Sequence, residues 1–194
     1  MSYFLHLYDI VYKTEQSRFV SARRMARSKI ASKVVESFLS ASIIAISLIA
    51  LIGDKDKDTS DMISVITIIL STFLLVISLL FSYLEYDKRY EKYMSCAMEL
   101  GEIHREMDML KETNSPLNTN DEKALLDKYN AVLHRYDINH TSFDYQYYMA
   151  SQNESACKIW WWIRFYILDV AFLYWMIAFI PLMAILWYCI VKIM

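Results

Sequence analysis

Residues 62–84 read MISVITIILSTFLLVISLLFSYL, a run of 23 residues that contains no charged side chain. An α-helix rises about 1.5 Å per residue, so a run of this length can cross the hydrocarbon core of a bilayer, which is about 30 Å thick. The sequence therefore predicts a transmembrane helix here, and the other segments can be assigned outward from it.

A shorter apolar run, SFLSASIIAISLIALI at residues 37–52, precedes this helix. It reaches the length of a span once residues 34–36 are included, with Lys33 and Glu36 snorkelling at headgroup level. The sequence GDKDKDTSD joins the two runs and is too polar to lie in lipid. Together the two runs predict a transmembrane hairpin over residues 34–84.

A third uncharged run covers residues 170–191. Three consecutive tryptophans precede it and Trp187 and Tyr188 lie near its end, which is typical of aromatic belts at the two membrane interfaces. The segment 159–194 is too short for two spans and a turn, so we expect one transmembrane helix there, with Pro181 as a kink.

The composition restricts the fold class further. Apolar residues make up 56% of the 194, and there are only two glycines and two prolines, too few for the turns of a sheet protein. Scarce glycine also excludes Gly-rich phosphate loops and dinucleotide-binding motifs. Cys96, Cys157 and Cys189 lack metal-ligand spacing, and the histidines form no paired motif. We therefore expect no metal, no cofactor and no disulfide framework.

Charge is distributed unevenly around a net value of −2. Seven Lys and Arg residues precede residue 34, whereas the hairpin loop has two lysines and four aspartates. By the positive-inside tendency, the N-terminus and residues 85–158 face the cytoplasm. The prediction is an all-α membrane protein in four segments: a basic N-terminal cytoplasmic helix (1–33), the transmembrane hairpin (34–84), a long cytoplasmic antiparallel helix pair (85–158) and one C-terminal transmembrane helix (159–194).

The predicted cytoplasmic pair carries a heptad-like pattern. Seven residues from Tyr86 to Met107 recur at alternating spacings of four and three, which predicts a helix over residues 85–112 that continues out of the second span. They are Tyr86, Tyr90, Tyr93, Ala97, Leu100, His104 and Met107. A turn containing proline follows, and a second stripe from Leu125 to Tyr147 predicts a helix that runs back into the third span. Coiled-coil packing is one interpretation of these tyrosine-rich stripes, and a ligand cleft lined by the tyrosines is the other.

Hydroxyl side chains form a stripe on the second span at spacings of three, four or seven residues, and a shorter line lies on the first span. Small hydroxyl residues either let membrane helices pack closely or face water in a pore. Both interpretations stay open. The candidate pore-lining residues are Ser64, Thr67, Ser71 and Ser78.

Two acidic residues, Glu36 and Asp169, lie within a turn or two of the predicted cytoplasmic boundary. Snorkelling to the interface explains both of them, and a gate or an ion-binding role is the alternative.

The sequence YDINHTSFDY at residues 136–145 concentrates polar and aromatic side chains. On one helix, His140 and Asp144 share a face four residues apart, so His140 can donate a hydrogen bond to Asp144. A buried polar network that fixes helix register is one interpretation, and general-base chemistry is the other. No motif places a nucleophile, so we do not expect an enzyme.

This segment resembles the signature of the SLATT family, the SMODS- and SLOG-associating two-transmembrane effectors. The family's usual acidic residue before Asn–His is Ile138 here, with Asp137 one step earlier. The basic sequence SARRM at residues 21–25 is also similar, and the resemblance covers residues 19–150. The signature positions are Tyr129, Tyr136, Asn139, His140, Asp144 and Tyr145.

The resemblance implies an antiviral effector of the bacterial inner membrane, acting by abortive infection under a nucleotide signal from a partner nucleotidyltransferase. The third span is similar to variants paired with a nucleotidyltransferase in two-gene systems such as Hailong. We therefore expect a homo-oligomeric, signal-gated ion channel, preferably a tetramer, because the helices of one subunit cannot enclose a pore. The alternative is a non-channel membrane anchor whose helix pair scaffolds a partner protein.

A nucleotide or short oligonucleotide needs cationic contacts to its phosphates. A dense basic run from Arg18 to Lys33 precedes the first span, and further cations leave the second span at the same depth. These residues can instead set topology and contact anionic lipid headgroups. The candidate ligand-binding residues are Arg23, Arg24, Arg27, Lys33, Lys88 and Arg89.

Overall fold

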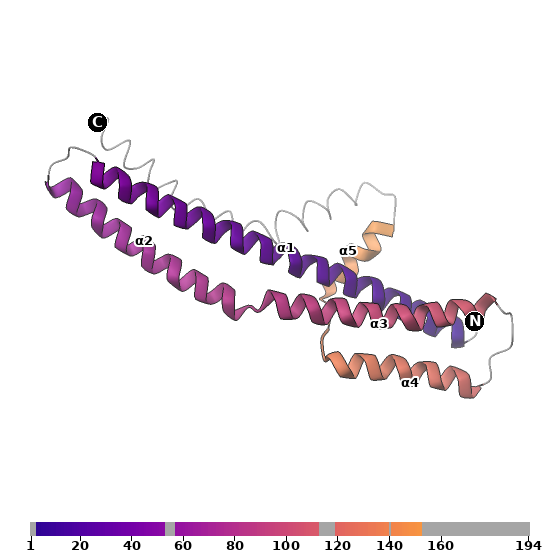
Figure 1. Ribbon diagram of the computed structural model, residues 1–194. Helices are drawn as coiled ribbons and strands as arrows, with labels where there is room; N and C mark the ends of the chain where they lie inside the picture. Colours follow the sequence, from indigo (N-terminus) through magenta and orange to yellow (C-terminus); the bar gives the residue numbers. More distant parts are fainter. Residues whose placement is uncertain (1–2, 53–56, 113–118, 140, 153–194) are drawn as a thin grey trace. The chain divides into compact units, whose positions relative to one another are not determined.

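The computed structural model describes residues 3–52, 57–112, 119–139 and 141–152, and every regular element among them is an α-helix. In chain order these are α1 (Tyr3–Ile52), α2 (Lys57–Tyr83), α3 (Tyr86–Glu112), α4 (Thr119–Tyr136) and α5 (Ser142–Gln152), shown in Figure 1. The all-helical fold class is confirmed for this part of the chain. The predicted C-terminal span falls outside the described residues.

The chain divides into two compact units, and α1 contributes to both of them. Among the described residues, the first unit contains those from 3 to 26 and from 86 to 152, and the second contains those from 27 to 85. The expected basic N-terminal helix and the first predicted span therefore belong to one uninterrupted helix.

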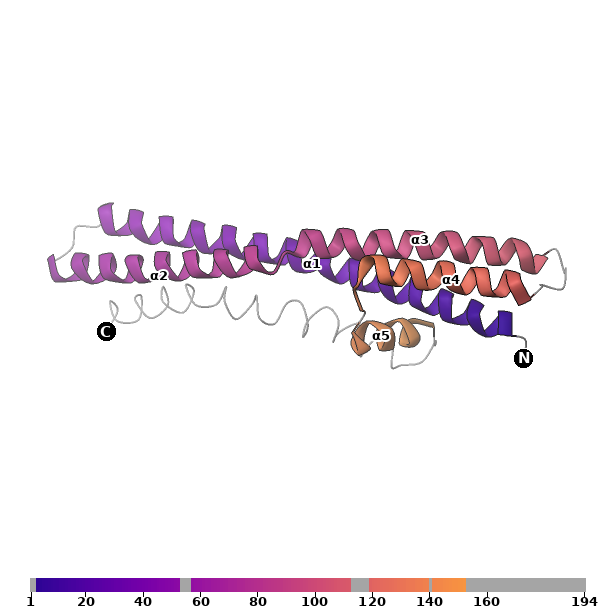
Figure 2. The same ribbon diagram turned by 90° about the horizontal axis from the view of Figure 1, so that it is seen from below.

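In the first unit α3 and α4 lie antiparallel, side by side (Figures 1 and 2). The expected helix pair is thus present, but the first half of α1 joins it as a third helix, which the sequence analysis did not foresee. α5 packs on α1 as well, through an edge-on contact between the rings of Tyr12 and Tyr148. Three helices supply the apolar core: Phe4, Leu7, Val11, Cys96, Leu100, Ile103, Met107, Leu125 and Val132.

The buried face of α1 follows a heptad. Its seam positions alternate at spacings of three and four residues, and each has an exposed fraction of 9% or less. An alternation of this kind keeps one face of a helix turned toward its partners over many turns. The seam residues are Phe4, Leu7, Val11, Thr14, Arg18, Ser21 and Met25 in the first unit, and Ser28, Ser32, Val35 and Leu39 in the second.

α3 does not continue α2, so the expectation of one continuous helix is wrong. Leu84 and Glu85 form a turn between them, and Glu85 has a φ of 46°. A residue in the left-handed region cannot extend a right-handed helix and is a common helix end. The Leu84 amide still donates to the Leu80 carbonyl at 3.1 Å, which closes the last turn of α2.

The expected continuous helix through residues 136–145 is also wrong. α4 ends at Tyr136, and Asp137 has a φ of 42°. α5 then begins behind a capping box, in which the Asp144 amide donates to Thr141 Oγ1 at 3.3 Å and the Thr141 amide donates to Asp144 Oδ2 at 3.2 Å. The helical spacing assumed for His140 and Asp144 therefore does not apply, and His140 itself lies outside the described residues.

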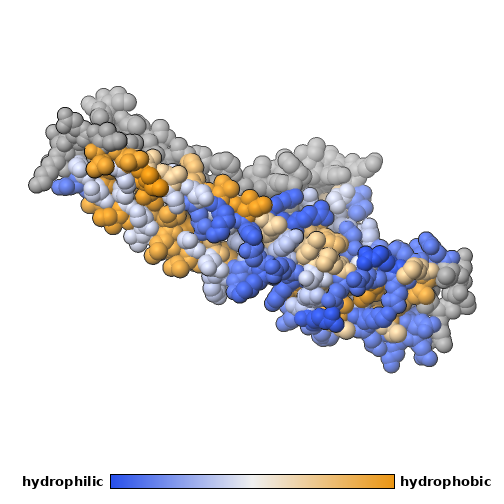
Figure 3. Space-filling model, viewed as in Figure 1, coloured by the Kyte–Doolittle hydropathy of each residue, from blue (hydrophilic) through white to orange (hydrophobic). Residues whose placement is uncertain are grey.

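The second unit contains a hairpin of the C-terminal half of α1 with α2 (Figure 1). Val35 and Leu39 are buried, with Leu74 and Phe81 packed against them, but most apolar side chains of this hairpin are exposed (Figure 3). Both helices are long and apolar enough to cross a membrane. In the most apolar stretch of each helix, only 17% of the residues are buried. A surface of this kind is suited to lipid or to other subunits.

Candidate functional site

The middle of α1 buries a polar layer inside the first unit. Thr14, Glu15, Ser17, Arg18 and Ser21 all have exposed fractions of 9% or less. Buried polar groups reduce stability unless they find partners, so a layer of five on one helix needs a reason.

Gly101 on α3 allows α1 to approach closely at this layer. A Cβ atom at position 101 would lie 3.2 Å from Glu15 Oε1, so any larger residue would press on that carboxylate. The glycine is therefore explained by helix contact rather than by a turn.

At the N-terminal end of the layer, Glu15 faces His104, whose Nδ1 lies 3.2 Å from Glu15 Oε2. The His104 ring lies between the rings of Tyr8 and Tyr12, each with its centroid 4.9 Å away. Burial raises the pKa of Glu15, against the opposing effect of His104. Tyr8 donates to Asp108 at 2.6 Å, a bond that together with burial raises the pKa of Tyr8 to about 12.

At the other end of the layer, Asp144 is fully buried and is surrounded by donors. Arg24 binds it at two points, with Nε 2.9 Å from Oδ1 and Nη2 2.9 Å from Oδ2. Ser21 Oγ and Thr141 Oγ1 each donate to Oδ2 at 2.8 Å. Asp144 therefore lies in a buried polar network in which Thr141 is a local partner, whereas Ser21 and Arg24 come from α1, about 120 residues upstream.

Three other described signature residues, Tyr129, Tyr136 and Asn139, also contact α1 or α3. The Tyr129 hydroxyl lies 3.2 Å from Thr14 Oγ1, and the Tyr136 hydroxyl donates to Glu99 at 2.7 Å. The Asn139 carbonyl accepts a bond of 2.9 Å from the Tyr93 hydroxyl. The signature therefore fastens α4, α5 and the turn between them to the rest of the first unit. Tyr145 is 36% exposed.

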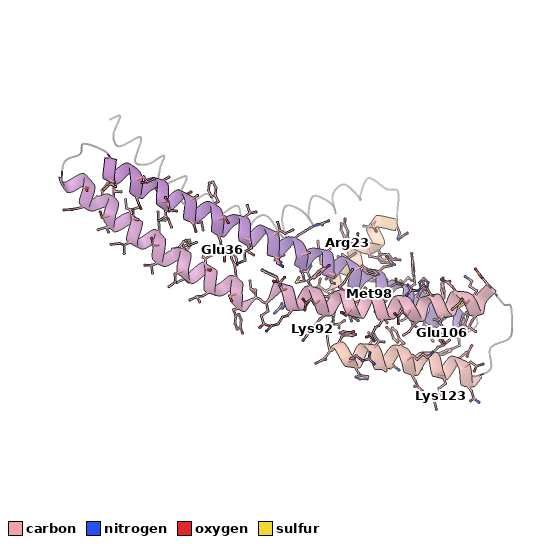
Figure 4. All side chains as sticks on the ribbon, in the orientation of Figure 1. Arg23, Glu36, Lys92, Met98, Glu106 and Lys123 are labelled. Atoms are coloured by element: carbon pink, nitrogen blue, oxygen red, sulfur yellow. The ribbon has the colours of Figure 1, made fainter. Side chains whose placement is uncertain are left out.

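The predicted ligand-binding cations are distributed over both units. Arg23, labelled in Figure 4, is exposed and donates to the carbonyl of Phe19 on its own helix at 3.4 Å. Arg24 is engaged with Asp144 as described above. Lys88 and Arg89 lie exposed in the first turn of α3.

Two of these cations belong to the second unit, Arg27 and Lys33. Lys33 is exposed and pairs with Glu36 at 2.9 Å. The binding role of the six cations stays a prediction.

The predicted pore-lining residues lie on α2. The hydroxyls of Ser64, Thr67 and Ser71 donate to the carbonyls four residues earlier, at 2.8–2.9 Å. Ser64, Ser71 and Ser78 are exposed, and each directly follows a buried isoleucine or leucine: Ile63, Leu70 and Ile77. The hydroxyl side chains of α2 therefore form a stripe next to the buried face of the helix, not on that face.

Within the described residues, no group of three or more His, Cys, Asp and Glu side chains is arranged to hold a metal ion. The acidic and histidine side chains of the polar layer contact one another and helix residues across the bundle, an arrangement that binds helices together.

The described residues form an all-helical protein in which two long apolar helices are candidate membrane spans and a helical bundle carries a polar core. The chain belongs to the SMODS and SLOG-associating 2TM effector domain family 5, whose model matches residues 2–187. This match confirms the SLATT resemblance and associates the chain with SMODS and SLOG signalling systems. No curated protein and no solved structure matches it.

Proposed function

We propose that this protein is the subunit of a homo-oligomeric, signal-gated ion channel in the bacterial inner membrane. The channel depolarises an infected cell as part of antiviral defence. A nucleotide or short oligonucleotide, made by a partner nucleotidyltransferase of a Hailong-type system, controls it. The N-terminus and the first unit face the cytoplasm, where that signal is made.

One observation carries the channel proposal: the hydroxyl stripe of α2 is exposed in the single chain. Ser64, Ser71 and Ser78 do not face α1, so they do not serve close packing inside the hairpin. Where the hydroxyl hydrogen is bound to a helix carbonyl, as in Ser64 and Ser71, the oxygen keeps lone pairs for an outside partner. Several copies around a symmetry axis turn such stripes toward a shared aqueous path, and a tetramer is the preferred arrangement.

Gating is supported by the continuity of α1. The same helix carries the polar layer that binds Asp144 and the apolar half that pairs with α2. We propose that a change in the first unit that moves α1 reaches the second unit through this shared helix.

The experiment is reconstitution of the purified chain into planar bilayers, with and without extract from cells that express the neighbouring nucleotidyltransferase. The proposal expects discrete conductance steps whose frequency changes with the extract. Silent bilayers at protein densities verified by immunoblotting would contradict it and favour a membrane anchor that scaffolds a partner.

A further inference from the structure

Arg18 belongs to the polar layer, but two nitrogen atoms of its guanidinium group lack hydrogen-bond acceptors among the described residues. It lies at a seam position of α1 with an exposed fraction of 3%. Its Nε and Nη1 atoms are buried and have no hydrogen-bond acceptor. Its guanidinium carbon lies 6.0 Å from the centre of the Tyr93 ring, and it also interacts with the buried thiol of Cys96.

The nearby carboxylates do not neutralise it. Glu15, one turn earlier on α1, faces His104. Asp144 accepts a bond from Ser21, which lies one turn after Arg18 on α1. Arg24 already binds Asp144 at two points. The third carboxylate lies one turn beyond Cys96 on α3. It is Glu99, which accepts bonds from Arg135 at 2.8 Å and from Tyr136 at 2.7 Å.

A guanidinium cannot escape this situation by losing its proton, because arginine stays charged in proteins. A charged group buried without a counter-ion is strongly unfavourable, and native proteins keep such groups where an ion or ligand completes them. The surroundings of Arg18 are already polar, since the hydroxyl residues Ser17 and Ser21 are fully buried on the same helix.

We infer that Arg18 is the residue that binds a phosphate group of a small soluble ligand inside the first unit, between α1 and α3. This inference deepens the proposed function and rests on it for the identity of the ligand as the signal. Guanidinium is the side chain best suited to phosphate, and an aromatic ring beside it suits a base or sugar. Arg18 is not among the six cations predicted from the sequence to bind the ligand.

Access to Arg18 depends on Tyr93. The Tyr93 hydroxyl donates to the Asn139 carbonyl in the turn between α4 and α5, so this ring and that turn are held together. A ligand that displaces the Tyr93 ring breaks this bond and frees the turn next to Asp144. Binding is thereby coupled to the signature residues that hold α5 on α1.

A lipid headgroup is a poor source for this phosphate. Arg18 precedes Val34, where the first predicted span begins, by 16 residues of continuous helix, or about 24 Å at about 1.5 Å per residue. The headgroup region lies closer to the span than that.

The test uses the full chain in detergent and inorganic pyrophosphate as the probe, against sodium chloride at equal ionic strength. For wild type we expect the thermal unfolding midpoint to rise by about 5 °C near saturation. Arg18→Met should abolish this rise without lowering the midpoint measured in chloride, because it removes an unpaired buried charge. Arg105→Met, which removes an exposed arginine from the same bundle, should keep the rise.

If Arg18→Met does not fold, Arg18→Lys replaces it and should reduce the rise by at least half. A rise that persists in the Arg18 variant, or that Arg105→Met also loses, overturns the inference. A shift caused by phosphatidylglycerol vesicles but not by pyrophosphate overturns it too, and assigns Arg18 to lipid. None of these readouts requires conduction, so bilayer currents test the channel separately.

Discussion

Arg24 and Asp144 form a two-point ion pair, with both nitrogen–oxygen distances at 2.9 Å, although they are 120 residues apart in sequence. The pair joins the longest helix of the protein to its shortest described one. The Arg24 side chain is 18% exposed and that of Asp144 is fully buried, so the pair is shielded from solvent and from salt.

Asp144→Ala should destabilise the first unit by about 3 kcal/mol, because removing one partner leaves the other charge buried and unpaired. Hydrogen exchange of the amides of α5 should become faster before the rest of the bundle is affected. Asp127→Asn, at an exposed position on α4, is the matched control and should change neither measurement. Unchanged protection of α5 in Asp144→Ala would show that the pair does not hold this helix.

Glu15 gives the first unit a dependence on pH. Its raised pKa means that the folded state binds this proton more tightly than the unfolded state does. The associated stabilisation is complete below the ordinary carboxyl pKa of about 4.3 and is lost as pH rises through the higher folded value. Glu15→Gln should remove this part of the pH dependence and raise the unfolding midpoint at pH 7.5 relative to wild type.

The measurement for Glu15 is thermal unfolding between pH 4.5 and 7.5 in one detergent. Glu106, labelled in Figure 4, pairs at the surface with Lys128 at 2.7 Å and provides the control. Glu106→Gln should leave the shape of the pH curve as it is in wild type. If the unfolding midpoint of Glu15→Gln has the same pH dependence as that of wild type, Glu15 is not the group responsible for this dependence.

Replacing Ser71 and Ser78 together with leucine should block ion flux while expression and assembly remain normal, because two apolar side chains dewet a narrow path. The control is Thr72→Leu, since Thr72 is also exposed and also donates to its own helix, at 2.9 Å, but lies off the stripe. Normal single-channel currents in the double variant would move these serines to packing positions. The hydroxyl line on the first span would then be the better pore candidate.

Native mass spectrometry in detergent should show a closed oligomer, with the tetramer as the expected species. The physical reason is that the apolar stretches of the two candidate membrane spans are mostly exposed in the single chain, so surface remains for contacts between copies. A strictly monomeric species at micromolar concentration would exclude the channel proposal.

Protein purified from cells that contain the neighbouring gene should carry a nucleotide or short oligonucleotide, which can be identified by mass spectrometry. If the cations predicted from the sequence bind it, Arg23→Glu combined with Arg27→Glu should weaken binding and reduce its salt dependence. Binding that keeps both its strength and its salt sensitivity in this variant would place recognition elsewhere, with Arg18 as the candidate that the structure supports.

Much of the fold could be predicted because two signals are strong in the sequence. The uncharged run at residues 62–84 contains most of α2, and the stripe from Tyr86 to Met107 includes Ala97, Leu100 and Met107 of the buried face of α3. The two breaks were missed because Glu85 and Asp137 adopt positive φ without being glycine, a conformation that sequence rarely marks.

The role of the first half of α1 was missed for a different reason. Its seam has the regular spacing of a packed helix, but Thr14, Arg18 and Ser21 occupy the central positions, so a search for apolar residues passes over it. The capping box at Thr141 and Asp144 was a readable local signal for the start of α5. The partners of Asp144 on α1 were not readable, because no local spacing specifies a contact across 120 residues.

The seam of α1 also fixes the phase of this helix within the first unit. Each inserted residue would rotate everything beyond it by about 100°, so a single insertion between Val11 and Arg18 would turn either the apolar core residues of α1 or the polar layer away from its partners. An insertion of seven residues restores the alternation of three and four. The spacing along α1 between the apolar core and the layer around Asp144 is therefore free to change only in whole heptads, and the helix sets it in steps rather than continuously.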